Sequence, residues 1–209
     1  MRAFCNSNIP LRQNGCPLKV KSRFNKQLIE ISTSMSQHLY ILTGGSRGMG
    51  LAIAEQLLQK GNTLICISRN TQSRLTEQAQ KVGATLEQWS HDLADGASAS
   101  FALKNWLEAH SSNEFQSATL INNAGVIPTI APLSQADPHN LAMALRVGLE
   151  APMQLCAAFL GATENWAVSR KVVNISSGLG RRAMASQQVI APLKRAWIIS
   201  HDALPWTKP

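Results

Sequence analysis

A glycine-rich turn between a predicted strand and a predicted helix carries the clearest chemical signal in the sequence. The apolar run 39–42 leads into Thr43-Gly44-Gly45-Ser46-Arg47-Gly48-Met49-Gly50, and apolar residues at helical spacing follow. Glycines in such a turn let backbone N–H groups approach a pyrophosphate, which the N-terminus of the following helix stabilises. The pattern predicts a dinucleotide site, and a turn with a purely structural purpose is the alternative. The residues expected to bind the cofactor here are Thr43, Gly44, Ser46, Arg47, Gly48, Met49 and Gly50.

The end of the second predicted strand indicates which nucleotide to expect. Sites selective for NAD usually place an acid here, where it binds the ribose 2′-hydroxyl. This strand instead ends in Ile67-Ser68-Arg69-Asn70. Arg69 can offer a planar guanidinium to a 2′-phosphate, and Arg47 can reach the same group. Two arginines without a carboxylate predict NADP(H), with Arg69 and Asn70 in the binding set; solvated surface arginines are the alternative.

Three further polar motifs each follow a predicted strand. They are Asp92-Leu93 after the third strand, Asn122-Asn123-Ala124-Gly125 after the fourth and Val173-Asn174-Ile175-Ser176-Ser177-Gly178 after the fifth. The carboxyl ends of parallel strands meet at one edge of a sheet, and ligands bind there. We therefore expect these motifs and the glycine turn to share one site.

The elements that must position these motifs alternate along the chain between apolar runs and amphipathic segments. Runs of this kind predict strands, and the amphipathic segments predict helices. Strict alternation with continuously apolar strands predicts an α/β Rossmann fold, a doubly wound parallel sheet with helices on both faces. The expected strands are 39–42, 63–67, 84–89, 118–121 and 171–175. The expected helices are 51–58, 71–82, 96–110 and 141–160.

The motifs, in this order over residues 38–182, resemble those of the short-chain dehydrogenase/reductase family. The residues around Ser177 resemble its sepiapterin reductase and benzil reductase branch. The resemblance implies an oxidoreductase that passes a hydride from a nicotinamide cofactor to a carbonyl. It also implies that Asp92 and Leu93 contact the adenine. The residues implied to line the cofactor at the fourth strand are Asn123, Ala124 and Gly125.

Catalysis in this family uses a serine, a tyrosine and a lysine together. The tyrosine gives a proton to the carbonyl oxygen, the lysine lowers the tyrosine's pKa, and the serine positions the carbonyl. The resemblance implies that Ser177 is the catalytic serine, with Ser176 as the alternative. An asparagine that often completes a proton relay aligns with Gly148, so the resemblance does not extend to that residue.

The Tyr-x-x-x-Lys that should follow Ser177 is missing. The chain there reads Gln187-Gln188-Val189-Ile190-Ala191-Pro192-Leu193-Lys194, and its only tyrosine is Tyr40. With suitable codons for 187–200, the bases read from the third position give Ala-Gly-Tyr-Cys-Ala-Ser-Lys-Ala-Gly-Leu-Asp-His-Phe, which resembles the family's catalytic helix. We hypothesise that the chain from about Ser186 onward is translated from a shifted frame. The chain as written would then be inactive or nearly so, and its fold incomplete at the C-terminal end.

The two ends of the chain carry more net positive charge than its body. The net charge of +8 comes mainly from residues 1–34 and 187–209, while 35–186 are nearly balanced, so we expect no nucleic-acid partner. We expect 35–186 to form the NADP-binding domain and 187–209 to be a tail foreign to the family. Residues 1–34 are expected to be disordered or non-native sequence before a true start at Met35. An acid-poor organelle transit peptide is the alternative.

The lengths of the apolar runs and the spacing of the cysteines restrict the class of protein further. The longest uninterrupted apolar runs fall short of the roughly 18 residues that span a bilayer, so we expect no membrane partner. Cys5, Cys16, Cys66 and Cys156 show neither C-x-x-C nor histidine pairing at metal-ligand spacing, which predicts no metal site. Cys66 and Cys156 are expected in the core, as suits a reducing cytoplasm.

Three functions compete on this reading. The leading one is an NADP-dependent carbonyl reductase by ancestry, with a small-molecule carbonyl substrate and a parent family that is often homo-oligomeric. The second is a non-catalytic NADP(H)-binding sensor or scaffold, which binding without turnover would support. The third is a basic protein associated with nucleic acid, whose salt-sensitive binding would be lost on deleting residues 1–34.

Overall fold

A computed structural model describes residues 37–182, which lie within one compact unit. They form a five-stranded sheet in the order β3-β2-β1-β4-β5, and every neighbouring pair of strands is parallel. The strands are β1 (His38–Thr43), β2 (Thr63–Ser68), β3 (Thr85–Ser90), β4 (Ser117–Asn122) and β5 (Ser169–Asn174). The predicted Rossmann fold is confirmed, and each predicted strand is present to within two residues.

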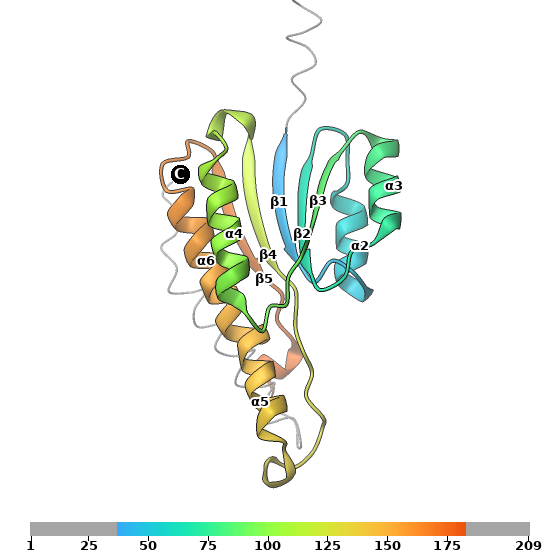
Figure 1. Cartoon of the computed structure of the whole chain (residues 1–209), viewed down its shortest axis with the longest axis vertical. Helices are drawn as coiled ribbons and strands as arrows, with labels where there is room; N and C mark the ends of the chain where they lie inside the picture. The colour runs from blue at the N-terminus through green and yellow to red at the C-terminus, as the bar shows by residue number, and fades with distance from the viewer. Residues whose placement is uncertain (1–36, 183–209) are drawn as a thin grey trace, which may run out of the picture. The chain divides into compact units, whose positions relative to one another are not determined.

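Helices cover both faces of the sheet (Figure 1). The helices are α2 (Gly48–Leu57), α3 (Ser73–Val82), α4 (Gly96–Glu108), α5 (Pro138–Leu145) and α6 (Ala151–Ala162). Short 3-10 turns lie at η1 (Ser112–Glu114), η2 (Leu133–Gln135) and η4 (Gly178–Gly180). Helices α2 and α3 lie on one face and α4 and α6 on the other, as a doubly wound sheet requires.

Each face of the sheet has its own apolar cluster, because successive side chains of a strand point to opposite faces. Leu39 and Ile41 of β1 belong to the cluster that includes α4 and α6. Leu42 of β1 and Cys66 of β2 belong to the cluster that includes α2 and α3. All four side chains are at most 1% exposed, and each fully buried leucine or isoleucine contributes about 1.5–3 kcal/mol.

Burial falls from the centre of the sheet to its edges. Every residue of β2 is buried, whereas no residue of β3 or β5 is. The prediction of continuously apolar, buried strands is therefore right for the centre and wrong for the two edges. An edge strand has only one neighbour, so its side chains are less covered, and β5 leaves Val173 40% exposed.

The predicted helix 141–160 is interrupted by the π-helical turn η3 (Arg146–Glu150), which links α5 to α6. Pro152 has no N–H to donate to the carbonyl of Gly148 four residues earlier, so the regular helical bond cannot form. Instead the Ala151 N–H donates to the Arg146 carbonyl, five residues back. Turns of this kind are frequent at functional sites.

The combined helical segment Pro138–Ala162 is long and apolar enough to cross a membrane by length and composition. However, Leu155 and Phe159 of this segment are fully buried in the apolar cluster that includes α4 and α6, as in the core helix of a globular domain. Predictions for residues 1–34, for the tail 187–209 and for the shifted frame fall outside the described residues.

Candidate functional site

The glycine turn leaves β1 at Thr43 and bends sharply at Gly44. Gly44 has φ +72°, a left-handed conformation that L side chains rarely adopt, and its N–H donates to the Ile67 carbonyl at 2.8 Å. A Cβ here would also lie 3.0 Å from the Cα of Ala124. The turn therefore needs glycine at this position both for its backbone angle and for its close approach to the end of β4.

Thr43 and Asn123 fasten the turn to the end of β4. The Thr43 Oγ1 accepts hydrogen bonds from the backbone N–H groups of Asn123 and Ala124, both at 3.0 Å. The Asn123 Nδ2 donates in return to the carbonyls of Thr43 at 3.0 Å and Gly44 at 3.3 Å. Thr43 is 1% exposed, so these bonds form away from water and hold two strand ends in one geometry.

Gly50, in the first turn of α2, allows the helix to lie directly on this network. A Cβ at Gly50 would overlap the carbonyl oxygen of Gly44 and lie 2.5 Å from the Asn123 Nδ2. Any larger residue would push the start of α2 away from the turn. Only glycine at Gly50 is compatible with the observed packing.

Helices α2 and α3 begin without a side-chain cap, unlike α4 and α5. Asp95 accepts from the Ser98 N–H before α4, and Asp137 accepts from the His139 N–H before α5. Arg47, in the same position before α2, makes no such bond, and the first turn of α2 contains no acid. The first N–H groups and the positive end of the helix dipole are therefore not neutralised by a side chain, which fits a phosphate of a bound dinucleotide.

The other predicted residues of this turn lie at the surface. Arg47 and Gly48 are exposed, Met49 is 57% exposed, and Ser46 is half-buried. Within residues 37–182, Arg47 forms no ion pair with a carboxylate. Its positive charge therefore adds to that of the helix end.

The loop after β2 has a fixed backbone and exposed side chains. The Ser90 Oγ donates to the Arg69 carbonyl at 3.0 Å, and the Ser68 Oγ donates to the Asn70 carbonyl at 2.8 Å. The side chains of Arg69 and Asn70 are exposed, and in the described part of the chain Arg69 also forms no ion pair. Hydrogen bonds thus hold the backbone of this loop, while the Arg69 guanidinium stays exposed.

The ends of β3 and β4 add the remaining predicted cofactor residues. Asp92 is exposed, and its Oδ1 accepts from the Ala94 N–H at 3.0 Å, which orders the turn into α4. Leu93 is 5% exposed, and its side chain packs in the core. Gly125 is exposed, and the space around its Cα is open.

The end of β5 carries the predicted catalytic serine. The Ile175 N–H donates to the Asn122 carbonyl at 2.9 Å, which extends the sheet pairing one residue past β5. Ser177 follows as an exposed residue whose Oγ accepts from the Leu179 N–H at 3.3 Å. Its hydroxyl hydrogen is not used in that bond. Gly148, at the position of the family's relay asparagine, is buried in the π-helical turn.

A second side-chain contact joins the ends of β4 and β5, three residues before this serine. The Asn122 Nδ2 donates to the Asn174 Oδ1 at 2.9 Å and to the Cys156 Sγ at 3.4 Å. Within residues 37–182, the Asn122 Oδ1 and the Asn174 Nδ2 are buried without a hydrogen-bond partner. The polar groups at the end of β5 are therefore only partly satisfied.

Both described cysteines are buried, as predicted, and are poor nucleophiles. Burial raises the pKa of the Cys66 thiol to about 12. Burial also raises the pKa of the Cys156 thiol to about 11, although the hydrogen bond from Asn122 lowers it. A thiol with so high a pKa is almost fully protonated at neutral pH, so neither cysteine is suited to covalent catalysis. Among the described residues no group of histidines, cysteines and acids could hold a metal ion.

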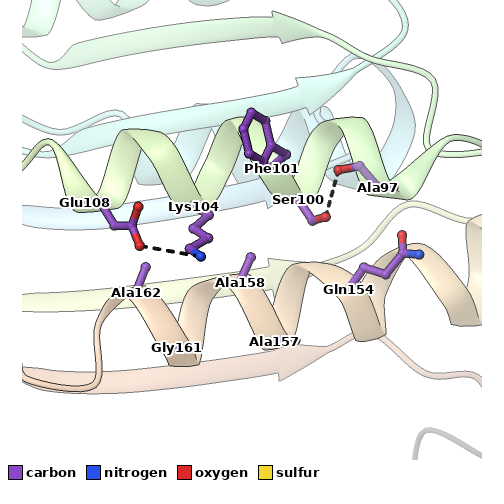
Figure 2. A pocket seen from close by; sticks show the side chains of 10 residues that line it. All are labelled: Ala97, Ser100, Phe101, Lys104, Glu108, Gln154, Ala157, Ala158, Gly161 and Ala162. Carbon is purple, nitrogen blue, oxygen red and sulfur yellow. Dashed lines mark hydrogen bonds and ion pairs between the residues drawn. The ribbon is translucent and has the colours of Figure 1, made fainter.

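A groove of about 630 Å³ lies elsewhere, between α4 and α6 (Figure 2). Its walls include Phe101 of α4 and Gly161 of α6, and the ion pair Lys104–Glu108 lies along one side. None of the predicted cofactor or catalytic residues lines it. The groove is therefore separate from the predicted site at the carboxyl edge of the sheet and is no evidence for it.

The structure brings one group of predicted residues into direct contact and places the others around it. The directly linked residues are Thr43, Gly44, Gly50, Asn123 and Ala124. Arg69, Asp92 and Ser177 come from the carboxyl ends of three other strands, because the sheet is parallel. Asn174 of the motif after the fifth strand takes part through Asn122. Sequence reasoning missed Gln72, whose Nε2 donates to the Ser46 carbonyl at 2.7 Å.

Residues 38–198 match the family described as short chain dehydrogenase. The chain belongs to the short-chain dehydrogenase family. A benzil reductase ((S)-benzoin forming) of Bacillus cereus is 36% identical over 141 residues, which are 68% of this chain and 57% of that enzyme. A sepiapterin reductase of Meriones unguiculatus is 32% identical over 147 residues, 66% of this chain and 56% of the enzyme. The chain thus spans little more than half the length of these relatives, and the predicted branch of the family is confirmed.

Solved structures of the family have the same fold. A short-chain dehydrogenase/reductase from Burkholderia vietnamiensis superimposes with a TM-score of 0.71 and 32% identity, over 82% of this chain and 78% of that one. A metagenomic short-chain oxidoreductase in complex with NADP superimposes with a TM-score of 0.68 and 26% identity, over 79% of this chain and 74% of that one. The family binds NAD or NADP, and it is a family of oxidoreductases.

Proposed function

We propose that this chain contains the cofactor-binding part of an NADP(H)-dependent carbonyl reductase. The observation that carries the proposal is the Thr43–Asn123 network, which holds the glycine turn under the uncapped start of α2. A bound pyrophosphate would accept hydrogen bonds from the first N–H groups of that helix. Bound NADPH would supply the hydride for carbonyl reduction.

The preference for the phosphorylated cofactor rests on Arg47 and Arg69. Both side chains are exposed at the same edge of the sheet, one before α2 and one after β2. Neither the glycine turn nor the end of β2 contains an acid that would repel a 2′-phosphate. Two guanidinium groups can bind such a phosphate through charge-assisted hydrogen bonds.

An Arg69→Ser substitution tests the cofactor proposal. Each hydrogen bond to a charged group contributes about 1.5–3 kcal/mol, so we expect NADPH affinity to fall about ten- to a hundredfold. The affinity for NADH, which lacks the 2′-phosphate, should change by less than about twofold. Isothermal titration calorimetry of the wild-type chain and the Arg69→Ser variant with each cofactor measures these affinities. An equal loss for NADH would contradict a role at the 2′-phosphate.

Ser177 would orient the substrate carbonyl in the parent reaction. Its Oγ already accepts the Leu179 N–H, so the hydroxyl hydrogen remains to donate to a carbonyl oxygen. The proton that completes reduction would come from the family's tyrosine, and the chain as written has no tyrosine beyond Tyr40. We therefore propose that this chain binds cofactor but turns over little or no substrate.

Turnover tests the catalytic part of the proposal. The full chain and a version whose codons from about 186 onward are shifted into the alternative frame are mixed with NADPH and benzil, the substrate named for the Bacillus cereus relative. A missing general acid lowers the rate by about a hundred- to ten-thousandfold, so the restored chain should oxidise NADPH at least that much faster. Equal rates would refute the proposed loss of catalysis. The nucleotide sequence of the gene tests the frame hypothesis, and an alternative frame without a family-like string would refute it.

A non-catalytic NADP(H)-binding module is the second candidate. The four hydrogen bonds of Thr43 and Asn123 at the glycine turn, beside a sequence without Tyr-x-x-x-Lys, favour it for the chain as written. Tight NADPH binding by a chain whose gene holds no family-like alternative frame would support this candidate.

We also propose a cytoplasmic location, no nucleic-acid or membrane partner, and homo-oligomerisation of the parent protein. The buried, protonated Cys66 and Cys156 suit a reducing compartment.

A further inference from the structure

Two glutamines link the two segments that carry the arginines. Gln72 lies at the end of the loop after β2 and just before α3, and its side chain makes no capping bond to that helix. Its Nε2 instead crosses to the glycine turn and donates to the Ser46 carbonyl at 2.7 Å. Ser46 directly precedes Arg47, so this bond ties the Arg69 loop to the Arg47 turn.

Gln88 of β3 holds Gln72 in place. Its Oε1 accepts the Gln72 N–H at 2.7 Å, and its Nε2 donates to the Gln72 carbonyl at 3.0 Å and to the Thr76 Oγ1 at 3.0 Å. One side-chain amide thus pairs with both backbone polar groups of Gln72. Both glutamines are half-buried, where hydrogen bonds compete less with water than at the surface.

The connection is continuous from the sheet to the turn. It runs from β3 through Gln88 to the backbone of Gln72, and from the Gln72 side chain to Ser46. The Arg69 backbone is held separately by Ser90, two residues after Gln88 on the same strand. The backbones that carry both arginines are therefore fixed to one strand, β3, while the guanidinium groups stay exposed.

We propose that Gln72 and Gln88 are positioning residues that hold Arg47 and Arg69 at the spacing needed to bind the 2′-phosphate of NADP(H) together. The inference rests on the proposed NADP(H) binding. Without the Gln72–Ser46 bond the Gly44–Ile67 hydrogen bond still joins the two strand ends, but the spacing of the arginines beyond it can vary more. Two charges that converge on one phosphate lose affinity when their spacing varies, because ordering them then costs conformational entropy on binding.

A Gln72→Met substitution removes the side-chain hydrogen bond and keeps a side chain of similar length. The matched control is Gln78→Met, because the Gln78 Nε2 also donates to a backbone carbonyl at 2.7 Å, that of Glu55, and joins α3 to α2. The control loses an equivalent bond from the same helix region without touching either arginine-bearing segment. Both variants are made in the full chain and titrated calorimetrically with NADPH and NADH.

For Gln72→Met we expect NADPH to bind about three- to tenfold more weakly, with NADH affinity unchanged, so the preference for NADPH falls by that factor. Gln78→Met should keep the wild-type preference. In an Arg69→Ser background, Gln72→Met should have little further effect on NADPH affinity, because the pair of arginines whose spacing it fixes is already incomplete. A purely structural role would instead lower the affinity for both cofactors and leave their ratio unchanged.

The outcomes separate this inference from the proposed function. A wild-type chain that prefers NADPH, with Gln72→Met keeping that preference, overturns the positioning role and leaves the cofactor proposal standing. A wild-type chain without any preference for NADPH overturns both. If Gln72→Met does not fold, Gln88→Met replaces it, since it removes both bonds to the Gln72 backbone and should produce the same loss of preference.

Discussion

Two junctions at the carboxyl edge of the sheet, one between β1 and β4 and one between β4 and β5, differ in how completely their polar groups are paired. Between β1 and β4, Thr43 and Asn123 exchange four hydrogen bonds with neighbouring backbone groups. Between β4 and β5, the Asn122–Asn174 pair leaves one buried oxygen and one buried nitrogen without partners in the described chain. The first junction carries the proposed phosphate site, and the second lies beside Ser177.

The difference separates cofactor binding from catalysis in this chain. The phosphate turn is built entirely from residues 37–182, and its geometry depends on groups that are already in contact. The serine end of β5 belongs to an edge strand with alternating exposure. The described residues therefore specify a nucleotide site more completely than a reaction site.

Filling the space at Gly50 should have the largest effect on the first junction. A Gly50→Val side chain would overlap the Gly44 carbonyl and press on Asn123, so we expect a loss of about 3 kcal/mol or more in the free energy of unfolding and no measurable NADPH binding. Chemical denaturation and calorimetry measure the two effects. Gly161→Ala is the control, because its Cβ meets no atom within 4 Å and should stabilise α6 by about 0.5–1 kcal/mol. A Gly50→Val chain that binds NADPH normally would contradict the packing described.

Removing the hydroxyl of Thr43 should have the next largest effect. Thr43→Val leaves the N–H groups of Asn123 and Ala124 without their acceptor, and a buried unpaired donor costs about 1–3 kcal/mol. We expect a loss of that size in the free energy of unfolding, together with weaker NADPH binding. Thr43→Ser keeps the acceptor oxygen and should retain most of both. A loss in Thr43→Ser with none in Thr43→Val would show that the methyl group, and not the hydroxyl, matters.

A double-mutant cycle tests the second junction. Asn122→Leu alone leaves the Asn174 Oδ1 without its donor and should cost about 1–3 kcal/mol. Asn122→Leu with Asn174→Val removes both polar groups of a pair that is already incompletely satisfied, so it should cost less than the sum of the single changes, by about 0.5 kcal/mol or more. Urea denaturation of the four chains measures this coupling. Additive losses would mean that the two asparagines do not act as a pair.

The last effect is absent at neutral pH and appears only at alkaline pH, where it concerns the buried thiol of Cys66. Burial raises the pKa of Cys66 to about 12 from 9.0, so above pH 9 the unfolded chain loses a proton that the folded chain keeps. The stabilisation is complete below pH 9 and is lost as the pH rises towards about 12. Thermal unfolding from neutral pH to about pH 11 should show a fall in Tm that is smaller in Cys66→Val. The same fall in both chains would assign it to other groups.

Much of the fold follows from the sequence because its signals are local. Strand-like runs, the spacing of Gly44, Gly48 and Gly50, and the polar residues after each strand are sufficient to predict the sheet and the position of the turn. The interruption of the long helix was signalled by Pro152, whose missing N–H prevents a regular turn. That signal was available in the sequence but was outweighed by the apolar helical spacing around it.

Other features depend on tertiary contacts that no local pattern encodes. Nothing in the spacing of Gln72 and Gln88 indicates that the Gln88 side chain pairs with the Gln72 backbone. The exposure of β3 and β5 depends on their places in the strand order, which the apolar runs alone do not determine. Residue type and spacing therefore predicted the site's position and most of its members, but not the side chains that fix its geometry.

Calorimetric titration of the full chain with NADPH and then NADH most directly tests whether the described residues form a nucleotide site. We predict one NADPH per chain, bound at least about tenfold more tightly than NADH, because Arg47 and Arg69 have a phosphate to bind only in NADPH. Binding should occur whether or not a carbonyl substrate is turned over. No binding of either nucleotide by the folded chain would contradict the assignment of the glycine turn, and equal binding of both would contradict the assignment of the arginines.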